Sequence, residues 1–492
     1  MSESACYILM LVMAGLIIFG FRSTIRDTRG SRALFSINGV MVTMFLLYVW
    51  VSAALSVLFD NFEFTWAPHY SGAENALPIL LICLFALASY MAGYSFFGRI
   101  ALSRLRSLKQ FEESLWGPPE PKMLVRVAAL SMIVIGILLK LYAILQTGGL
   151  DESVIRLSGG LRENLNIGQE DVTLTWVRNF SGIAEVAASW MLVIAIRRRR
   201  GLVLWGALFI VTVALVYLGN FGKRTYLLEP LFAVVLAFHF YVRRLQLSSM
   251  PYVLVGVIVF GMGSQLLRAV LPAYMNNIDI SYIDASWSHG SWLGFYFYSL
   301  EFAFFEAMTV TIYESDQIIE MFGSTANAFY ITNIEPMLYL IPRYFWPDKP
   351  TAFIDMGHAT TTLMFGGSPS TVEWGTAASY IGNSWALGGP IGTALYSFML
   401  AFIAAYSDVF MMRATGENKD AKILVYSVLL FAAFILWRQG GLGWSFMSLV
   451  PNQIGYILGF GSLLYLTIGR SRRSREPAAR RRAHWDTVSR GP

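Results

Sequence analysis

The sequence predicts an all-α polytopic membrane protein with about 11 transmembrane helices. Two observations support this fold class. The 492 residues are 56% hydrophobic and only 14% charged, which is too apolar for an ordinary soluble chain. The apolar residues also recur in runs of about 20, the length that crosses a bilayer as a helix. No segment is therefore expected to fold as an independent soluble domain.

The spacing of the apolar runs gives the expected helices and divides the chain into four parts. The helices cover roughly 5–21, 34–59, 76–97, 124–146, 174–196, 202–219, 225–242, 251–272, 386–411, 421–438 and 445–469. Helices 1 to 8 lie in 1–272, a large and partly helical outer loop occupies 273–385, helices 9 to 11 follow in 386–469, and a basic tail ends the chain at 470–492. Loops as long as 273–385 are usually functional. Its apolar segment 291–313 is expected to form a re-entrant or interfacial helix pair.

The basic residues predict the orientation. Lysine and arginine gather in every second inter-helix segment, at Arg22–Arg32, Arg99–Lys122, Arg197–Arg200, Arg243–Arg244, Arg413–Lys422 and the tail from Arg470. Positive residues mark the cytoplasmic side, so the N-terminus is predicted outside and the C-terminus in the cytoplasm. The formal net charge of +6 is thus a topology signal, and it predicts membrane lipids as partners and no nucleic acid.

A second group of basic residues lies on the predicted outer side, where the positive-inside rule does not explain it. Arg224, Arg268 and Arg438 are at or within the ends of spanning helices, where burying a cation costs roughly 3 kcal/mol. A guanidinium donates two parallel hydrogen bonds to phosphate oxygens, which makes arginine a natural ligand of a lipid-linked pyrophosphate. Further candidates for this anion site are Arg162, Lys223, Arg343 and Lys349.

Two structural explanations compete with the anion site. The arginines could pair with carboxylates, for which the candidates are Glu185, Glu229, Glu301, Glu306 and Glu335. Lys140 is expected to extend its side chain to the membrane interface instead of binding a ligand.

The most distinctive string of the outer loop is Ile341-Pro342-Arg343-Tyr344-Phe345-Trp346-Pro347-Asp348-Lys349-Pro350. Its prolines make it rigid. The aromatic faces of Tyr344 and Trp346 suit sugar rings, and the two cations suit phosphate. The alternative is an aromatic belt segment at the membrane interface.

A base that removes a proton from a sugar hydroxyl has to be a histidine or a carboxylate within reach. His358, near this string, is the candidate, and a satisfied structural histidine is the alternative. The five histidines are dispersed and the outer carboxylates form no Asp-Asp pair, so neither a metal site nor a cofactor is expected. The spacings Gly388-x-x-x-Gly392 and Gly455-x-x-x-Gly459 predict helix packing.

These features resemble the O-antigen polymerase family, the Wzy-type polymerases of oligosaccharide repeat units. The likeness rests on the 11-helix plan with one dominant late outer loop, on Gly222-Lys223-Arg224 opening a helix, on the Ile341–Pro350 string, and on Gly382-Asn383 before Gly388-Gly389-Pro390-Ile391-Gly392. The resemblance spans most of 1–470 in architecture, while its motifs cover about 40 residues.

Membership would imply a GT-C-like glycosyltransferase of the bacterial inner membrane that works on the periplasmic face. Donor and acceptor would be undecaprenyl-pyrophosphate-linked oligosaccharides, no cofactor would be needed, and a chain-length regulator would be a partner. The family's motif transfers a substrate-binding role to Arg224 and Arg343 only, whereas Arg162, Arg268 and Arg438 rest on the charge argument. We therefore expect Arg224, Arg343 and His358 to act in catalysis. O-antigen ligase and a flippase of the lipid-linked unit are the alternatives.

Overall fold

The computed structural model describes the chain in separate stretches. They are residues 2–25, 35–60, 64, 67–104, 123–146, 148–149, 177, 179–219, 225–243, 245, 249, 252, 255–256, 259, 263, 304–338, 355–367, 377–412, 419–443 and 454–466. Within these stretches every regular element is a helix, which confirms the all-α prediction for the described residues.

Six of the described helices are long and apolar enough to cross a membrane. They are Ser2–Ser23, Ile37–Val57, Ala73–Ser103, Met123–Gln146, Ser379–Met412 and Asp420–Gln439. Shorter apolar helices cover Leu202–Leu218, Leu227–Tyr241 and Ile454–Leu466. Each of these nine overlaps a helix expected from the sequence, and together they agree with a multi-pass membrane protein.

The chain forms two compact units. Unit 1 contains 1–103, 245–413 and 429–451, and unit 2 contains 104–244, 414–428 and 452–492. Each unit is described by itself.

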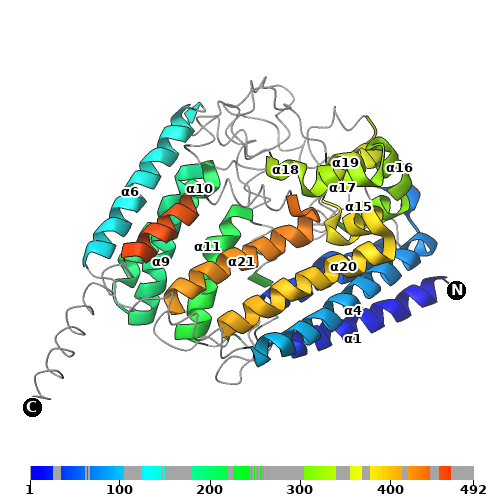
Figure 1. Ribbon diagram of the computed structural model, residues 1–492, viewed down its shortest axis with the longest axis horizontal. Coiled ribbons are helices and arrows are strands. Elements are labelled where there is room, and N and C mark those ends of the chain that lie inside the picture. Colours follow the sequence, from blue (N-terminus) through cyan, green and yellow to red (C-terminus); the bar gives the residue numbers. More distant parts are fainter. Residues whose placement is uncertain are drawn as a thin grey trace, which may run out of the picture. The chain divides into compact units, whose positions relative to one another are not determined.

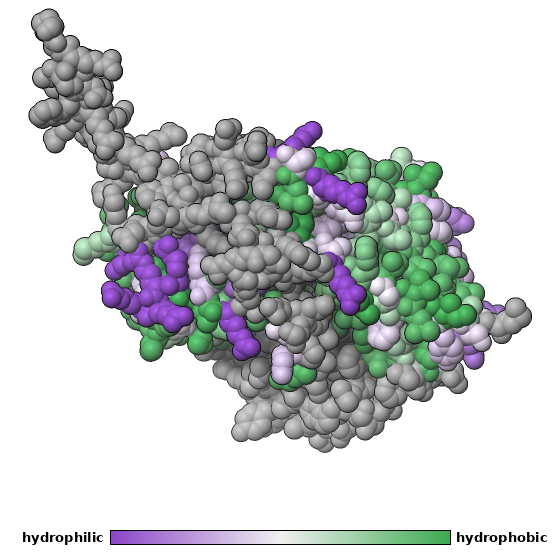
Figure 2. All heavy atoms as spheres, turned by 90° about the horizontal axis from the view of Figure 1, so that it is seen from below, coloured by the Kyte–Doolittle hydropathy of each residue, from purple (hydrophilic) through white to green (hydrophobic). Residues whose placement is uncertain are grey.

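Unit 1 is a bundle in which α4 (Ala73–Ser103) packs along α20 (Ser379–Met412), with α1 (Ser2–Ser23) beside α4 (Figure 1). The approach of α4 and α20 depends on a glycine, because a Cβ at Gly93 would lie only 2.9 Å from Ala401 Cβ. The outer face of α1 is apolar. Ile8, Leu11 and Phe19 are 61%, 73% and 54% exposed, and Figure 2 shows the hydrophobic area to which this face belongs. Such a face suits contact with lipid tails.

A buried carboxylate joins three helices of this bundle. Asp408 of α20 is fully buried and accepts hydrogen bonds from the backbone N–H groups of Ile37 (2.9 Å) and Asn38 (3.2 Å), at the start of α2 (Ile37–Met44). The Tyr94 hydroxyl of α4 donates a third bond of 2.7 Å. The first N–H groups of a helix have no partner within the helix, so Asp408 caps α2 from a distant part of the sequence.

The helix that begins as α2 changes its winding halfway. Residues Phe45–Val51 form a π-helix, η1, before α3 (Ser52–Asp60) restores the α-helical geometry. π-helical turns are rare in proteins, and those that occur are often found at functional sites.

Five short helices form a cap on unit 1. They are α15 (Phe304–Tyr313), α16 (Ser315–Met321), α17 (Thr325–Asn333), α18 (Glu335–Leu338) and α19 (Met356–Phe365). Ile318, Phe322, Ala328, Met356 and Ala359 make its small core. The expected helix pair at 291–313 corresponds to α15 in its second half only, since 291–303 lie outside the described residues.

α20 is not a straight span. In a straight helix Tyr380 and Ser397 would lie about 25 Å apart, yet their hydroxyl oxygens are 3.4 Å apart, and Ser384 and Thr393 hydroxyls also meet at 3.4 Å. The chain therefore reverses at Gly388 and Gly389, and the short arm 379–387 folds back on the long arm that starts at Pro390 (Figure 1).

This reversal corrects two expectations from the sequence. The sequence predicts that the ninth helix begins at residue 386, whereas α20 begins at Ser379. Of the glycine pair predicted to pack, Gly388 has no atom within 4 Å of an added Cβ, whereas a Cβ at Gly392 would lie 2.4 Å from the Ser384 carbonyl oxygen. Gly389 is required for its backbone instead, because its φ of +53° and ψ of −141° are closed to other residues.

Unit 2 is arranged around α9 (Gly182–Arg198), which contacts α6 (Met123–Gln146), α10 (Leu202–Gly219) and α11 (Thr225–Tyr241). The packing predicted for the second glycine pair is confirmed. A Cβ at Gly455 would lie 2.6 Å from the Asn179 and Phe180 carbonyls, and one at Gly459 would lie 2.5 Å from Val186.

Charged groups of unit 2 pair with one another. Lys140 is 3% exposed and interacts electrostatically with Glu185, so the expectation that it reaches the membrane interface is wrong. Arg197 forms an ion pair of 3.0 Å with Asp420, which also accepts a 2.6 Å bond from the Tyr241 hydroxyl.

Candidate functional site

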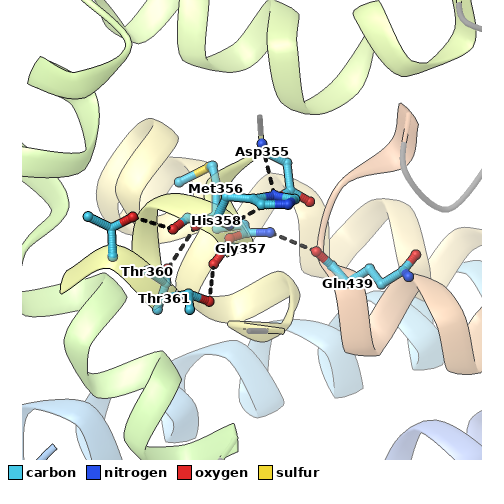
Figure 3. Close-up of polar contacts among 9 residues, drawn as sticks. Asp355, Met356, Gly357, His358, Thr360, Thr361 and Gln439 are labelled. Atoms are coloured by element: carbon cyan, nitrogen blue, oxygen red, sulfur yellow. Dashed lines mark hydrogen bonds and ion pairs between the residues drawn. The ribbon is translucent and has the colours of Figure 1, made fainter. Parts of the chain in front are cut away.

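A histidine and an aspartate form a close pair at the start of α19 (Figure 3). Asp355 is the N-cap residue, and its carboxylate accepts a 2.9 Å bond from the His358 N–H. The same oxygen lies 2.6 Å from Nδ1 of the His358 ring. An aspartate three residues before a helical residue is a common capping arrangement, so local sequence accounts for the position of both side chains.

The hydrogen bonds decide which ring nitrogen of His358 carries the proton. Nδ1 lies 2.6 Å from the Asp355 carboxylate oxygen and 3.4 Å from the Asp355 backbone nitrogen. A protonated Nδ1 donates to the carboxylate, whereas an unprotonated Nδ1 accepts from the backbone N–H, so only one of the two bonds can form. The short bond to a charged oxygen is the stronger one. We therefore assign the proton to Nδ1, which leaves a lone pair on Nε2.

The pair also changes the basicity of the ring. The hydrogen bond to Asp355 raises the pKa of His358 above its usual value; burial opposes this effect and the carboxylate charge adds to it. The side chains of both residues remain 15% exposed, and among the described residues none bonds to Nε2. His358 is thus a structural cap through Nδ1 and an available base through Nε2.

Hydrogen bonding holds α19 against α15. The hydroxyls of Thr311 and Thr360 are 2.8 Å apart and both are buried. This contact fixes the helix that carries His358 to a neighbour with its own buried face, Phe304 to Ile312.

Arg438 lies at the last turn of α21 (Lys419–Gln439), and its surroundings are aromatic. The guanidinium carbon is 5.7 Å from the centre of the Phe304 ring. Glu306 and Glu335 are described carboxylates that were candidates to pair with this arginine. Neither forms an ion pair with Arg438, and no other described residue does. Among the described residues this cation therefore has no carboxylate partner, while Glu301, another candidate partner, lies outside them.

An aromatic cluster around Trp437 includes Phe304, the ring that contacts this arginine. Trp437 stacks on Tyr48 of the π-helix at 5.4 Å and meets Phe45, Phe304 and Tyr380 edge to face at 6.0 to 6.5 Å. The π-helix thus supplies Phe45 and Tyr48 to the place where Arg438 lies, which gives its unusual winding a role.

The turn after α21 passes between two buried asparagines. Asn383 of the short arm donates through Nδ2 to the Gln439 carbonyl at 2.8 Å. On the α17 side, Asn333 Oδ1 accepts from the Tyr396 hydroxyl at 2.6 Å and from Leu442 N–H at 3.0 Å. Gly440 is required here, since its φ is +72° and a Cβ would lie 2.5 Å from Asn383 Nδ2.

α15 relates the arginine to the histidine. Phe304, below Arg438, and Thr311, beside α19, are seven residues apart, which is about 10 Å along a helix. The same helix, α15, thus contacts both Arg438 and the helix that carries His358.

Most of the residues predicted from the sequence lie outside the described part of the chain. They are Arg162, Lys223, Arg224, Arg268, Arg343, Tyr344, Trp346 and Lys349. Of the predicted set, His358 and Arg438 are described, and both belong to unit 1.

The sequence reading missed Asp355 and Asn383 as members of the site. Asp355 had a detectable signal, because an aspartate three residues before a histidine at the start of a helix marks a cap. In the sequence Asn383 is part of a glycine-rich string, and its partner Gln439 is 56 residues further along the chain, so no local pattern joins them.

The described residues contain no group of three histidine, cysteine or acidic side chains that could hold a metal ion. Comparisons with protein-family models, with curated proteins and with solved structures find no match for this chain. The described residues define an all-α fold with six helices long and apolar enough to span a membrane, and with a histidine–aspartate pair on one of its short helices. The resemblance to O-antigen polymerases remains a prediction from sequence motifs.

Proposed function

We propose that this protein is a membrane glycosyltransferase that polymerises undecaprenyl-pyrophosphate-linked oligosaccharide repeat units on the periplasmic face of the bacterial inner membrane. The product would be a surface polysaccharide such as O-antigen, capsule or exopolysaccharide. The proposal includes the finer architecture of 11 spanning helices, a GT-C-like arrangement, a periplasmic N-terminus and a cytoplasmic C-terminus.

The observation that carries the proposal is Arg438, a partly buried cation at the end of a spanning helix without an ion-pair partner among the described residues. An anionic ligand would offset the cost of placing it there. A diphosphate held by a planar fork fits this chemistry, and the aromatic rings beside it suit the face of a sugar.

In the proposed reaction His358 is the base that activates the acceptor hydroxyl. Its Nε2 accepts the proton of the acceptor hydroxyl while the oxygen attacks the anomeric carbon of the donor sugar. The bond from that carbon to the diphosphate oxygen breaks with inversion, and polyprenyl diphosphate leaves with the electron pair. Asp355 stabilises the imidazolium that forms, and Arg438 stabilises the charge on the leaving group. Arg224 and Arg343 join this anion site on the sequence argument alone.

The test is reconstitution of the full chain in liposomes with a lipid-linked repeat unit, with the products separated on a gel. Polymerase activity gives a ladder of products. We expect Arg438→Met to abolish the ladder and Arg438→Lys to leave a weak one, because lysine keeps the charge and loses the bidentate fork. Arg343→Ala should behave like Arg438→Met.

Three outcomes would reject the proposal. A ladder from Arg438→Met equal to that of the unaltered protein would remove the anion site. Transfer of glycan to a lipid A core alone would assign a ligase. Movement of the lipid-linked unit across the bilayer without covalent change would assign a flippase.

A further inference from the structure

The two asparagines beside the Gln439–Gly443 turn are alike in burial and differ in how far their amides are satisfied. Both are 3% exposed. Asn333 uses its Oδ1 twice, and its Nδ2 donates to the Phe329 carbonyl at 3.1 Å. Asn383 uses Nδ2 only, and among the described residues none donates to its Oδ1.

The orientation of the Asn383 amide is fixed. Gln439 offers a carbonyl oxygen, which can only accept, so the NH₂ group of Asn383 has to face it. Oδ1 therefore points away from Gln439. A buried carbonyl oxygen without a donor destabilises the fold, so a partner for Oδ1 is expected.

The chemistry of the missing partner follows from this geometry. The partner has to donate a hydrogen bond to Oδ1. Ionised phosphate oxygens only accept, so the diphosphate that suits Arg438 cannot fill this position. A hydroxyl group or an amide N–H can.

Two further polar atoms near the same turn are without a partner among the described residues. They are Trp437 Nε1, a donor, and Thr332 Oγ1, which can donate or accept. Trp437 is three residues before Gly440, and a Cβ at Gly441 would lie 2.9 Å from Thr332 Cγ2. A hydroxyl group can pair with either atom, because it both donates and accepts hydrogen bonds.

We infer that Asn383 is the central residue of a subsite for a neutral sugar, in which Asn383 Oδ1 accepts a hydrogen bond from a ring hydroxyl. The subsite rests on the proposed function and names its acceptor substrate as a glycan bound through hydroxyl groups, separate from the diphosphate at Arg438. The short arm of α20 exists, on this view, to carry Asn383 back into the bundle against α21.

The experiment measures direct binding to the full-length protein, purified in a detergent without a sugar headgroup. The probes are neutral methyl glycosides (of glucose, galactose and N-acetylglucosamine) and, separately, farnesyl diphosphate. Binding is followed by saturation-transfer NMR and by the shift in melting temperature. We expect at least one glycoside to bind, and Asn383→Leu to weaken it about tenfold, as expected for one hydrogen bond.

Matched variants separate binding from folding. Asn333→Leu removes three satisfied bonds and should lower the melting temperature more than Asn383→Leu does, with the glycoside affinity kept. Asn38→Leu is a second control, since Asn38 Oδ1 also has no partner among the described residues but belongs to the Asp408 network. Asn383→Asp should keep glycoside binding at low pH, where a protonated carboxyl donates to Gln439 and still offers an acceptor, and should lose it as pH rises.

Equal glycoside affinity in Asn383→Leu and the unaltered protein would overturn the inference. So would the absence of binding by every glycoside, which would assign a buried water to Oδ1. Glycoside binding without any binding of farnesyl diphosphate would reject the proposed function and leave the sugar subsite in place.

Discussion

Unit 1 contains two aspartates that cap helices, Asp408 and Asp355, and they differ in whether the groups around them still have an unused hydrogen-bonding atom. Asp408 is fully buried, caps α2 from another helix, and has donors on both oxygens. Asp355 caps its own helix, is partly exposed, and uses one oxygen to hold a histidine whose second nitrogen remains available. The first arrangement is complete and the second is open toward a ligand.

The difference shows how to separate structural polar groups from functional ones in a membrane bundle. A completed network stabilises the fold and leaves no group for chemistry. An incomplete one costs stability, and a ligand can repay that cost. The same contrast recurs between Asn333 and Asn383.

His358→Gln should have the largest effect and tests whether the open pair is catalytic. Glutamine at this position keeps the capping arrangement but cannot act as a base. We expect polymer synthesis to fall by at least about 100-fold with the melting temperature unchanged. Retained synthesis would place His358 with Asp408 among the structural groups.

Asp408→Asn tests the completed network. The amide NH₂ would face N–H donors and leave them unpaired, so we expect a loss of about 3 kcal/mol in the free energy of unfolding. Tyr94→Phe removes one of the three bonds and should cost about 1 kcal/mol. Activity per folded molecule should be unchanged in both, and a specific loss of activity would break the comparison.

Gly389→Ala tests the reversal that brings Asn383 into the site. Its backbone conformation is closed to alanine, so we expect a loss of about 2 kcal/mol in stability. Gly388→Ala is the matched control, because its φ of −163° is extended and nothing lies near the added methyl group. Similar melting temperatures for the two variants would contradict the hairpin geometry.

Asp355→Asn should have the smallest effect and sharpens the role of the carboxylate. Asparagine caps a helix as well as aspartate does, so folding should be kept. The carboxylate raises the pKa of His358, and a base works only when neutral, so its removal should move the acid limb of the pH–rate profile to lower pH. An unchanged limb would separate Asp355 from the base.

The Asp355–His358 pair also makes the stability of the fold depend on pH. A folded-state pKa above the unfolded value means that the pair stabilises the protein most below about pH 6.5. This contribution is lost as pH rises through the raised pKa. Melting curves of Asp355→Asn and the unaltered protein should therefore converge toward alkaline pH.

Much of the helical plan could be read from the chain. Apolar runs predicted the position of each candidate span because a lipid environment demands about 20 apolar residues in succession. Arg438 and His358 were identified because a cation in a span and a histidine near a rigid loop are locally unusual. The remaining candidates, such as Arg224 and Arg343, remain predictions.

Local sequence patterns did not predict contacts between residues that are far apart in the chain. The reversal in α20 was missed because Gly388-Gly389-Pro390 also fits packing within a straight helix, and only the approach of Ser397 to Tyr380 excludes that. Lys140 was misjudged because its partner, Glu185, is on another helix. No periodicity in the sequence encodes such pairings.

The sequence by itself determined that the helices suit a lipid environment, since hydropathy is a property of composition and run length. Only the tertiary structure decided which polar side chains have hydrogen-bond partners. These bonds join atoms that are far apart in the chain, as Asn383 with Gln439 (56 residues) and Asp408 with Ile37 (371 residues) show.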